Sequence, residues 1–284
     1  MKRKILLGLL LGAIAAAGFA SESDGIFTVK VGQFEVSMMV ERENPGNAGI
    51  LAGVDAATLK QYIPAAGFKH STNMFLIKTP GRNILVDTGF GQTVFDKITK
   101  LGVKPEQIDA VLMTHLHPDH IGGLAKDGKA LFPNATIYLS AKEREYFTKT
   151  QVSQAAVAAL APYGSKVVTF DPSELGGKLT ELLPGIFPIA AYGHTPGHTM
   201  YLLDSNGSKF IIWGDLLHVA LVQFPLPDIS TTYDMDQKAA ATIRRQTLDY
   251  AAKNKIPIGG MHIVYPAVGT VIADGNGFKF VPAK

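Results

Sequence analysis

Short apolar segments separated by turn-forming residues recur along nearly the whole chain. Residues 28–32 and 34–38 alternate apolar and polar side chains, which predicts two half-buried strands. Residues 73–78 and 83–86 predict a β-hairpin around a Pro-Gly turn. The apolar, β-branched residues 108–113 predict a short buried strand.

Segments with a helical period lie between these strands. Residues 94–101 predict a short helix, and residues 236–254 predict a long, alanine-rich amphipathic helix. Ser140 followed by Glu143 has the spacing of a capping box, which predicts a helix over residues 140–148.

Residues 48–69 are ambiguous, because a helix over 55–62 fits either a loop near a site or a plain surface excursion. A further helix is expected over 155–163. Further strands are expected at residues 135–139, 166–170, 187–191, 200–204, 209–213 and 256–260, with a closing hairpin over 269–281. Strands and helices therefore interleave in both halves, without an internal repeat or a linker.

Composition limits the chemistry that is available. The chain has 284 residues, which is enough for one large domain with a substantial core. Cysteine is absent, so the chain has no disulfide, no thiolate ligand and no thiol nucleophile. Any metal ligand must therefore be His, Asp or Glu.

The N-terminus has the pattern of a secretory signal peptide. Residues 1–4 are basic, residues 5–17 are apolar, and Gly18-Phe19-Ala20 offers the small residues that a signal peptidase reads. We expect cleavage after Ala20 and a periplasmic or secreted protein; an uncleaved anchor is the alternative. The leader holds three basic residues, so the remaining chain has 24 basic and 24 acidic residues. This balance gives no electrostatic case for nucleic acid or membrane partners.

Histidine and aspartate gather in the segment Thr114-His115-Leu116-His117-Pro118-Asp119-His120. His115 and His117 point to the same side of an extended backbone, because side chains alternate along a strand. The segment follows the strand at 108–113, and a helix is expected to start at Ile121. Imidazole and carboxylate groups together suit zinc and its first-row neighbours.

Other candidate ligands also follow predicted strands. Asp87 comes after residues 83–86, and its expected role is to accept a hydrogen bond from the far nitrogen of a ligating histidine. His198, Asp215 and His262 follow later strands. His194 competes with His198, and we expect it to lie behind the ligands. The seven expected metal ligands are His115, His117, Asp119, His120, His198, Asp215 and His262.

Seven ligands exceed the three or four that one zinc ion takes, so two ions sharing a carboxylate are expected. Two metals roughly 3.5–4 Å apart can activate a bridging hydroxide for attack on a carbonyl or phosphoryl centre. Zinc is the default, and manganese, iron or cobalt fit the same groups.

These motifs resemble the metallo-β-lactamase superfamily. The matching pieces are Thr114 to His120, Thr195 to Thr199, Gly214-Asp215, and His262 after a short strand. The resemblance implies a single α+β domain over residues 21–284, folded as a four-layer αββα sandwich. It also implies that His115, His117 and His198 hold one metal and that Asp119, His120 and His262 hold the other. Asp215 would bridge them, and Asp119 would take a proton during turnover.

The branch of the superfamily is narrowed by several differences. β-Lactamases of this family lack the bridging aspartate. Glyoxalase-II-type thioesterases add a helical domain after the last histidine, and the nuclease branch needs an inserted domain and a basic surface. Residues 213–220, with Gln223-Phe224-Pro225, are similar to methyl parathion hydrolase and its exported relatives, which are close to lactonases.

The expected function is therefore an exported dinuclear metallohydrolase that opens lactones or aryl esters. Organophosphate triester hydrolysis is the alternative, and a metal-binding protein without turnover is a remote one. Phe90, His218 and Phe224 are the candidate pocket residues, each of which could instead belong to the core. The expected partner is a small ester, lactone or phosphotriester; a homodimer is compatible with the sequence, which does not fix the oligomeric state.

Overall fold

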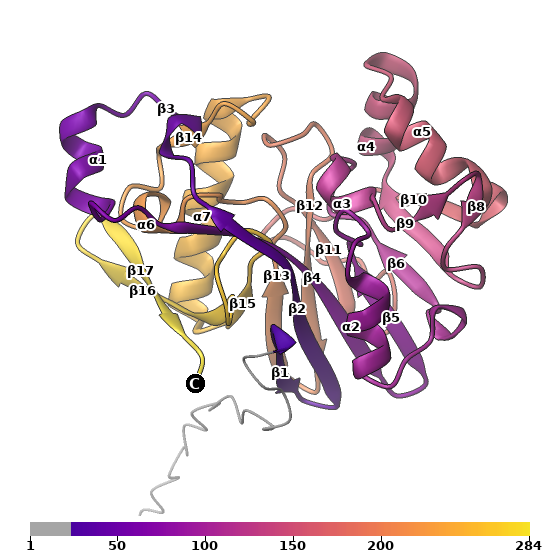
Figure 1. Cartoon of the computed structure of the whole chain (residues 1–284). Helices are drawn as coiled ribbons and strands as arrows, with labels where there is room; N and C mark the ends of the chain where they lie inside the picture. Colours follow the sequence, from indigo (N-terminus) through magenta and orange to yellow (C-terminus); the bar gives the residue numbers. More distant parts are fainter. Residues whose placement is uncertain (1–23) are drawn as a thin grey trace, which may run out of the picture.

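Two β-sheets lie face to face in the computed structural model, which describes residues 24–284 (Figure 1). The first sheet has the order β1 (Ile26–Val31), β2 (Phe34–Pro45), β4 (Lys69–Thr79), β5 (Arg82–Val86), β6 (Ala110–Leu112), β9 (Thr136–Ser140) and β10 (Val167–Phe170). The second has the order β11 (Ile186–Ala190), β12 (Thr199–Ser205), β13 (Ser208–Ile212), β15 (Ile258–Gly259), β16 (Val268–Asp274) and β17 (Gly277–Pro282). Two ribbons complete the strands: β3 (Leu51–Ala52) with β14 (Ser230–Thr231), and β7 (Ala125–Lys126) with β8 (Lys129–Ala130).

The core lies between and outside the sheets because successive side chains of a strand face opposite ways. On β4, Phe75 and Ile77 pack into the cluster that joins the two sheets. Their neighbours Met74 and Leu76 pack on the outer face of the first sheet. That outer face is covered by α2 (Val94–Lys100) and α5 (Gln154–Leu160).

The second sheet is covered on its far side by α7 (Gln237–Asn254). On β12, the Tyr201 hydroxyl donates to the Met113 carbonyl of the first-sheet side, whereas Met200 lies 3.8 Å from the Thr247 hydroxyl of α7. The layers are therefore helices, sheet, sheet and helix, which confirms the four-layer αββα sandwich in a single domain.

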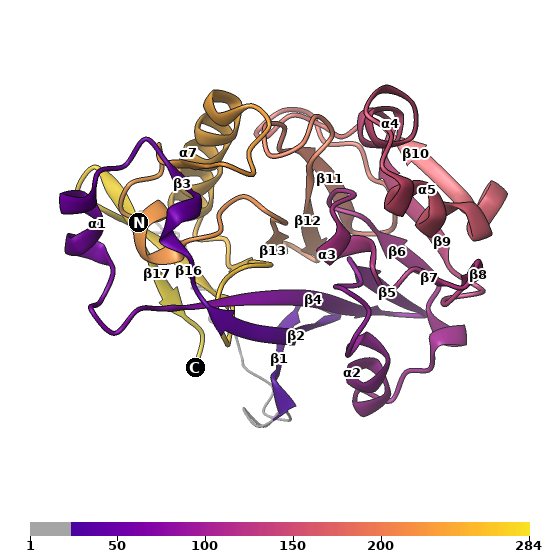
Figure 2. The ribbon, with the colours of Figure 1, turned by 45° about the horizontal axis from the view of Figure 1, so that its top comes forward.

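Short helices occupy the loops. They are α1 (Ala56–Tyr62), α3 (Pro118–Ile121), α4 (Ala141–Glu145) and α6 (Ala220–Gln223), with 3-10 turns at Ala48–Ile50, Pro105–Gln107 and Ala161–Lys166 and a π turn at Tyr146–Thr150. Helix α3 and the segment that follows β13 lie at the same end of the two sheets (Figure 2). Within the described residues, no helix is long and apolar enough to cross a membrane.

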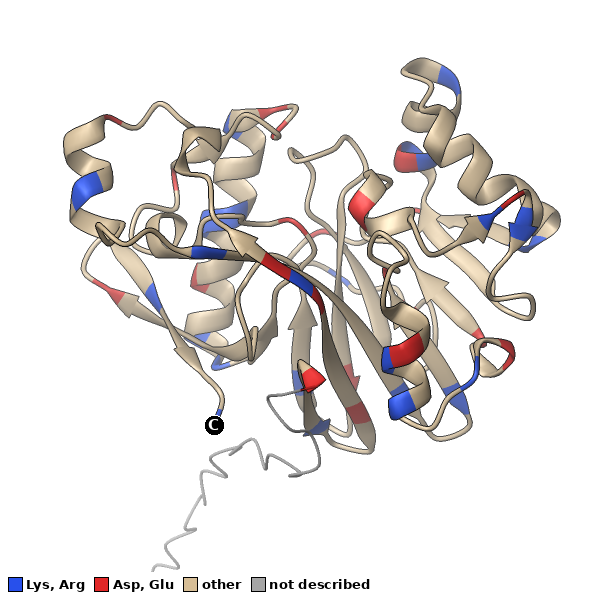
Figure 3. Cartoon of the chain, in the orientation of Figure 1, with Lys and Arg blue, Asp and Glu red and all other residues tan. Residues whose placement is uncertain are grey.

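Two local expectations are wrong. The helix at the histidine segment ends at Ile121 instead of starting there. Ser140 makes no side-chain hydrogen bond that caps α4. The Glu143 carboxylate instead accepts hydrogen bonds from the Leu116 backbone N–H and the Thr195 hydroxyl. The expected signal peptide, residues 1–20, lies outside the described residues. Lys and Arg are interspersed with Asp and Glu along the ribbon (Figure 3), in keeping with their equal numbers after residue 20.

Candidate metal centre and active site

The candidate ligands gather where strands end on one side of the sandwich. β5 and β6 run parallel, as do β13 and β15, so the carboxyl ends of each pair share an edge. The donors follow these strands or lie in neighbouring loops: Asp87 after β5, His115 and His117 after β6, Asp119 and His120 on α3, His194 before β12, Asp215 and His218 after β13, and His262 after β15.

One group of donors consists of His115, His117, His194 and Asp215, whose ligand atoms lie within 4.8 Å of one another. The Nδ1 atom of His117 faces the Nε2 atoms of both His115 and His194 at 3.0 Å. The His117 Nδ1 atom carries at most one proton, so that proton can form a hydrogen bond with only one of the two Nε2 atoms. Tetrahedral zinc with bonds near 2.0–2.1 Å would separate its nitrogen ligands by about 3.3 Å. The spacing therefore fits the ligands of a single ion.

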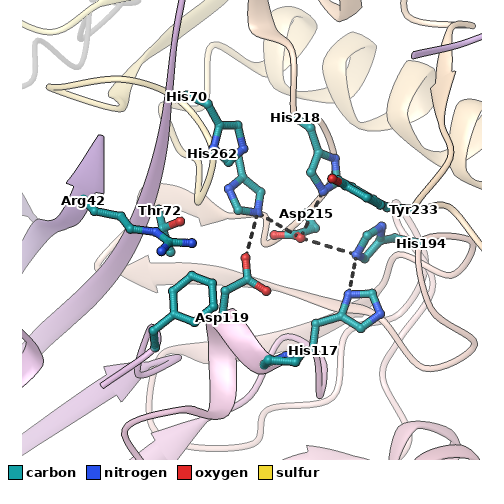
Figure 4. A pocket seen from close by; sticks show the side chains of 12 residues that line it. Arg42, His70, Thr72, His117, Asp119, His194, Asp215, His218, Tyr233 and His262 are labelled. Atoms are coloured by element: carbon teal, nitrogen blue, oxygen red, sulfur yellow. Dashed lines mark hydrogen bonds and ion pairs between the residues drawn. The ribbon is translucent and has the colours of Figure 1, made fainter. Parts of the chain in front are cut away.

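A second group consists of Asp119, His120 and His262. The Asp119 Oδ2 atom lies 3.8 Å from His120 Nε2 and 3.7 Å from His262 Nε2. Asp215 reaches this group as well, with Oδ1 3.2 Å from His120 Nε2 and Oδ2 3.0 Å from His262 Nε2. The Asp215 carboxylate is thus common to both groups (Figure 4).

Two buried atoms in this region fit a cation. His120 Nε2 and Asp215 Oδ1 are both inaccessible to water and, although they lie 3.2 Å apart, neither makes a hydrogen bond of good geometry within the described part of the chain. Leaving buried polar atoms unpaired costs roughly 1–3 kcal/mol each. A divalent ion would satisfy both atoms, so the residues fit metal binding at this position.

Hydrogen bonds on the far side of three rings aim their Nε2 atoms at the centre. The Nδ1 atom of His120 lies 2.7 Å from the Asp87 carboxylate, as the sequence led us to expect. His262 Nδ1 lies 2.8 Å from the Ser71 carbonyl, and His194 Nδ1 lies 3.0 Å from Asp234. Such outer partners fix the tautomer and orientation of metal-binding histidines.

The backbone at Asp87 is itself unusual. Its φ of 58° lies in the left-handed region, which non-glycine residues rarely adopt. The carboxylate also accepts hydrogen bonds from the backbone N–H and the hydroxyl of Thr114. The strained turn therefore points one buried carboxylate at both the histidine segment and His120.

The protonation of the cluster reflects burial and opposing charge. Burial lowers the pKa of His117 to about 3, so this ring is neutral at pH 7, the form that binds metal. Burial alone would also lower the pKa of His194, but its hydrogen bonds to Asp215 and Asp234 raise that pKa to about 9. Burial opposes ionisation of Asp215, yet the surrounding histidines hold its pKa well below the usual range. Protons on some of the histidine rings therefore offset the negative charge of the carboxylates, which a bound cation would offset in their place.

His194 and His198 exchange the roles that the sequence predicted for them. The His198 Nε2 atom accepts a hydrogen bond from the Asp215 backbone N–H at 3.0 Å, and its Nδ1 lies 2.9 Å from the Ala191 carbonyl. Both ring nitrogens are occupied by backbone groups, so His198 has none to offer a metal. His194 Nε2 instead lies 3.3 Å from Asp215 Oδ2. The assignment of His198 as a ligand is wrong in this structure, and His194 takes its place.

An open pocket of about 450 Å³ lies over these donors. Phe90 and His218 line it, and His218 Nε2 lies 3.2 Å from Asp215 Oδ2. Phe224 does not line it, which corrects its assignment as a pocket residue. The Phe224 ring is 3% exposed and packs against Trp213 and Phe280 in the core.

Four residues around the pocket were not identified from the sequence. Arg42, Thr72 and Tyr233 line the pocket, and Asp234 supports His194 from behind. His70, to which the sequence gave no role, also lines the pocket and stacks on His262 with ring centroids 4.6 Å apart. Thr72 shares a strand face with His70, but because the sequence gave His70 no role, the alternation of β4 pointed to neither residue. Asp234 and Tyr233 follow a two-residue strand and carried no such signal.

Two solved structures share the fold over most of the chain. One is the hydrolase AbOPH of the beta-lactamase superfamily, with a TM-score of 0.83 and 28% identity over 92% of this chain and 98% of that one. The other is AidC, a dizinc quorum-quenching lactonase in complex with its product, with a TM-score of 0.82 and 25% identity over 92% of this chain and 98% of that one.

Curated relatives match shorter stretches. The exodeoxyribonuclease WalJ of Streptococcus pneumoniae is 33% identical over 100 residues, 31% of this chain and 37% of that protein. An N-acyl homoserine lactonase of Bacillus cereus is 25% identical over 170 residues, 49% of this chain and 60% of that protein. The chain therefore spans less than two thirds of the length of either relative.

The sequence model of one family covers residues 67–252, which include all the donors described above except His262. That family is the one whose motifs the histidine segment and Gly214-Asp215 resemble, and the αββα layers agree with it. The chain belongs to the metallo-beta-lactamase superfamily.

Proposed function

We propose that this protein is a dinuclear metal-dependent hydrolase that opens lactones or aryl esters. The observation that carries the proposal is the position of Asp215, whose two oxygens face both donor groups at the base of an open pocket. Two divalent cations held by these groups would supply the charge that polarises an ester carbonyl and acidifies water. The likeness to a dizinc lactonase over most of the chain supports the lactone class.

Asp119 is the residue that we assign to proton transfer. Burial raises the pKa of Asp119, but His120 and His262 lower it by a larger amount, so the net pKa lies below the usual value. Asp119 is therefore ionised at neutral pH and can accept a proton released during attack. It also lines the pocket, so it can pass that proton to the departing alcohol oxygen.

The pocket walls hold the rest of the substrate. Phe90 and Tyr233 offer aromatic faces, while Thr72 and Arg42 offer hydrogen-bond donors (Figure 4). A cavity of about 450 Å³ accommodates a lactone ring with a short substituent. Residues 1–20 further lead us to propose that the protein is exported, which mass analysis of the mature N-terminus would test.

A panel of substrates tests the function directly. The metal-loaded protein is assayed on γ- and δ-lactones, aryl esters and a paraoxon-like triester, with bound metal measured by mass spectrometry. We expect about two metal equivalents and the highest kcat/KM on a lactone or aryl ester. A triester kcat/KM about tenfold higher would establish the phosphotriesterase alternative. Absence of hydrolysis at full metal loading would leave only a metal-binding role.

A further inference from the structure

Arg42 brings to the pocket wall a positive charge that has no ion-pair partner among residues 24–284. Its guanidinium carbon lies 3.9 Å from the centre of the Phe90 ring, and the side chain lines the pocket. Its Nε atom is buried and has no hydrogen-bond partner among residues 24–284. Figure 4 shows the guanidinium pointing from β2 toward the space above Asp119 and His262. The side chain therefore presents hydrogen-bond donors to the pocket.

The position of Arg42 is set by its neighbours on both sides. The pairing of β2 with β4 shifts register between Val40 and Arg42, which indicates a bulge at this point. The intervening Glu41 carboxylate accepts hydrogen bonds from the backbone N–H groups of Phe90, at 2.6 Å, and Gln92, at 2.8 Å. Glu41 thus fixes the position of the loop that carries Phe90, whose ring contacts the Arg42 guanidinium.

Glycine at position 89 is needed for this arrangement. A Cβ atom there would lie 2.6 Å from the Glu41 carboxylate, and the φ of Gly89 is +64°. The close approach lets the carboxylate reach the loop backbone. The Glu41 carboxylate accepts hydrogen bonds from these backbone N–H groups, and among the described residues it forms no ion pair with the Arg42 guanidinium.

The carboxylates inside the pocket are also engaged elsewhere. Asp119 lies near His120 and His262, and Asp215 contacts these same rings together with His194. The guanidinium has no ion pair within the described residues. The guanidinium is a planar group of N–H donors in a partly dehydrated pocket wall. Its geometry is complementary to a carboxylate, which it can bind through two parallel hydrogen bonds.

We propose that Arg42 selects lactone or ester substrates that carry a free carboxylate beside the bond to be cleaved. The inference rests on the proposed hydrolase function and adds the substrate class. The carboxylate pairs with the guanidinium while the ester carbonyl lies over Asp215 and Asp119. A neutral substituent of the same shape leaves the guanidinium without a charged partner.

Matched substrates test the proposal on the full-length, metal-loaded enzyme. A γ-butyrolactone bearing a carboxylate is compared with its carboxamide, each rate being normalised to hydrolysis by free hydroxide. We expect the parent to favour the carboxylate by about tenfold or more in kcat/KM. Arg42→Met should reduce this preference by about tenfold or more, and Arg42→Lys should retain part of it. The control Arg82→Met removes an exposed arginine of β5 that lies outside the pocket and should leave the preference intact.

Several outcomes would overturn the inference. An equal loss on both substrates would mean that Arg42 only shapes the wall, and a parent that prefers the carboxamide would contradict the proposal directly. A protein that opens neither lactone would contradict the proposed function instead. In that case, calorimetry can test the role of Arg42 without turnover. It compares binding of glutarate, which carries two carboxylates, with binding of butyrate, which carries one. Arg42→Met must weaken glutarate binding about tenfold more than butyrate binding, and an equal change refutes the proposal.

Discussion

Asp119 differs from the other carboxylate of the candidate metal centre in its access to solvent. Its side chain is 24% exposed, compared with 2% for Asp215. Both carboxyl groups keep low pKa values because nearby histidines offset the effect of burial. Both carboxylates line the pocket, but Asp119 is the more exposed of the two, as a group that exchanges protons with a substrate requires.

Asp119→Asn tests this role. The amide keeps the shape and one oxygen but cannot take up a proton, so kcat on a lactone should fall by about 10²- to 10⁴-fold. Steady-state rates at saturating metal, with metal content measured on the same sample, provide the readout. Hydrolysis at the parent rate with both metals bound would remove Asp119 from the mechanism.

His194 and His198 predict opposite phenotypes. His194→Ala removes a donor that faces Asp215 and should lower metal stoichiometry by about one equivalent. His198→Ala removes a ring that is hydrogen-bonded to two backbone groups, and it should lower the free energy of unfolding by roughly 1–3 kcal/mol. This variant should retain more bound metal than His194→Ala. Metal analysis and urea unfolding measure the two effects. Loss of metal from His198→Ala alone would restore the sequence-based assignment.

The sequence identified the donors but not their final directions. His115 and His117 could be paired because a strand fixes side chains two apart on one face. His194 and His198 share an irregular loop, where no period decides which ring turns inward. The loop direction depends on Gly193, whose φ is +135° and where a Cβ would lie 2.2 Å from the Ala240 nitrogen of α7. That contact joins residues distant in sequence, so the local pattern could not reveal it.

At the scale of elements, Glu143 joins α4 to two loops of the candidate metal centre. Its carboxylate accepts hydrogen bonds from the backbone N–H groups of Leu116 and Gly197 and from the Thr195 hydroxyl. Burial raises its pKa to about 7, although these donors partly oppose the change. One side chain thus positions the segments that carry His115, His117 and His194, in place of the predicted capping box.

This raised pKa predicts a pH dependence of stability. Between about pH 4.5 and 7 the folded protein holds a proton at Glu143 that the unfolded chain has released. The free energy of unfolding should therefore fall as pH rises through this range, by up to about 3 kcal/mol from this group. Urea unfolding of the parent and of Glu143→Gln at pH 5 and 8 isolates the effect, because Gln does not titrate. Parallel pH profiles for the two proteins would contradict the raised pKa.

Strands could be predicted better than the short helices. The hairpins β4–β5 and β12–β13 follow from alternation and Gly turns, and the structure confirms both. Helix α3 has four residues, too few for a helical period to appear in the sequence. Its direction is set instead by packing: a Cβ on Gly122 would lie 2.5 Å from the Phe90 backbone, so α3 is held against the loop beside the pocket.

At the scale of the whole molecule, the candidate metal centre connects the two sheets. His115, His117, Asp119 and His120 follow a strand of the first sheet, while His194, Asp215 and His262 come from loops of the second. Ions shared by both sets would bind the folded chain and not the separated halves. Metal affinity should therefore contribute directly to the stability of the sandwich.

Removal of metal tests that connection. Each bound metal ion, at a thousandfold excess over its dissociation constant, adds about 4 kcal/mol to the free energy of unfolding, which corresponds to a rise in Tm on the order of 10 °C per ion. Dialysis against EDTA should lower the Tm by this amount and abolish lactone hydrolysis, and added zinc should restore both. EDTA saturated with zinc beforehand controls for effects of the chelator itself. His194→Ala should show a smaller change in Tm on chelation, because it has already lost one donor of the group that contains His115, His117 and Asp215. An unchanged Tm after verified metal removal would show that bound metal does not help to hold the two sheets together and that the donors are arranged independently of any ion.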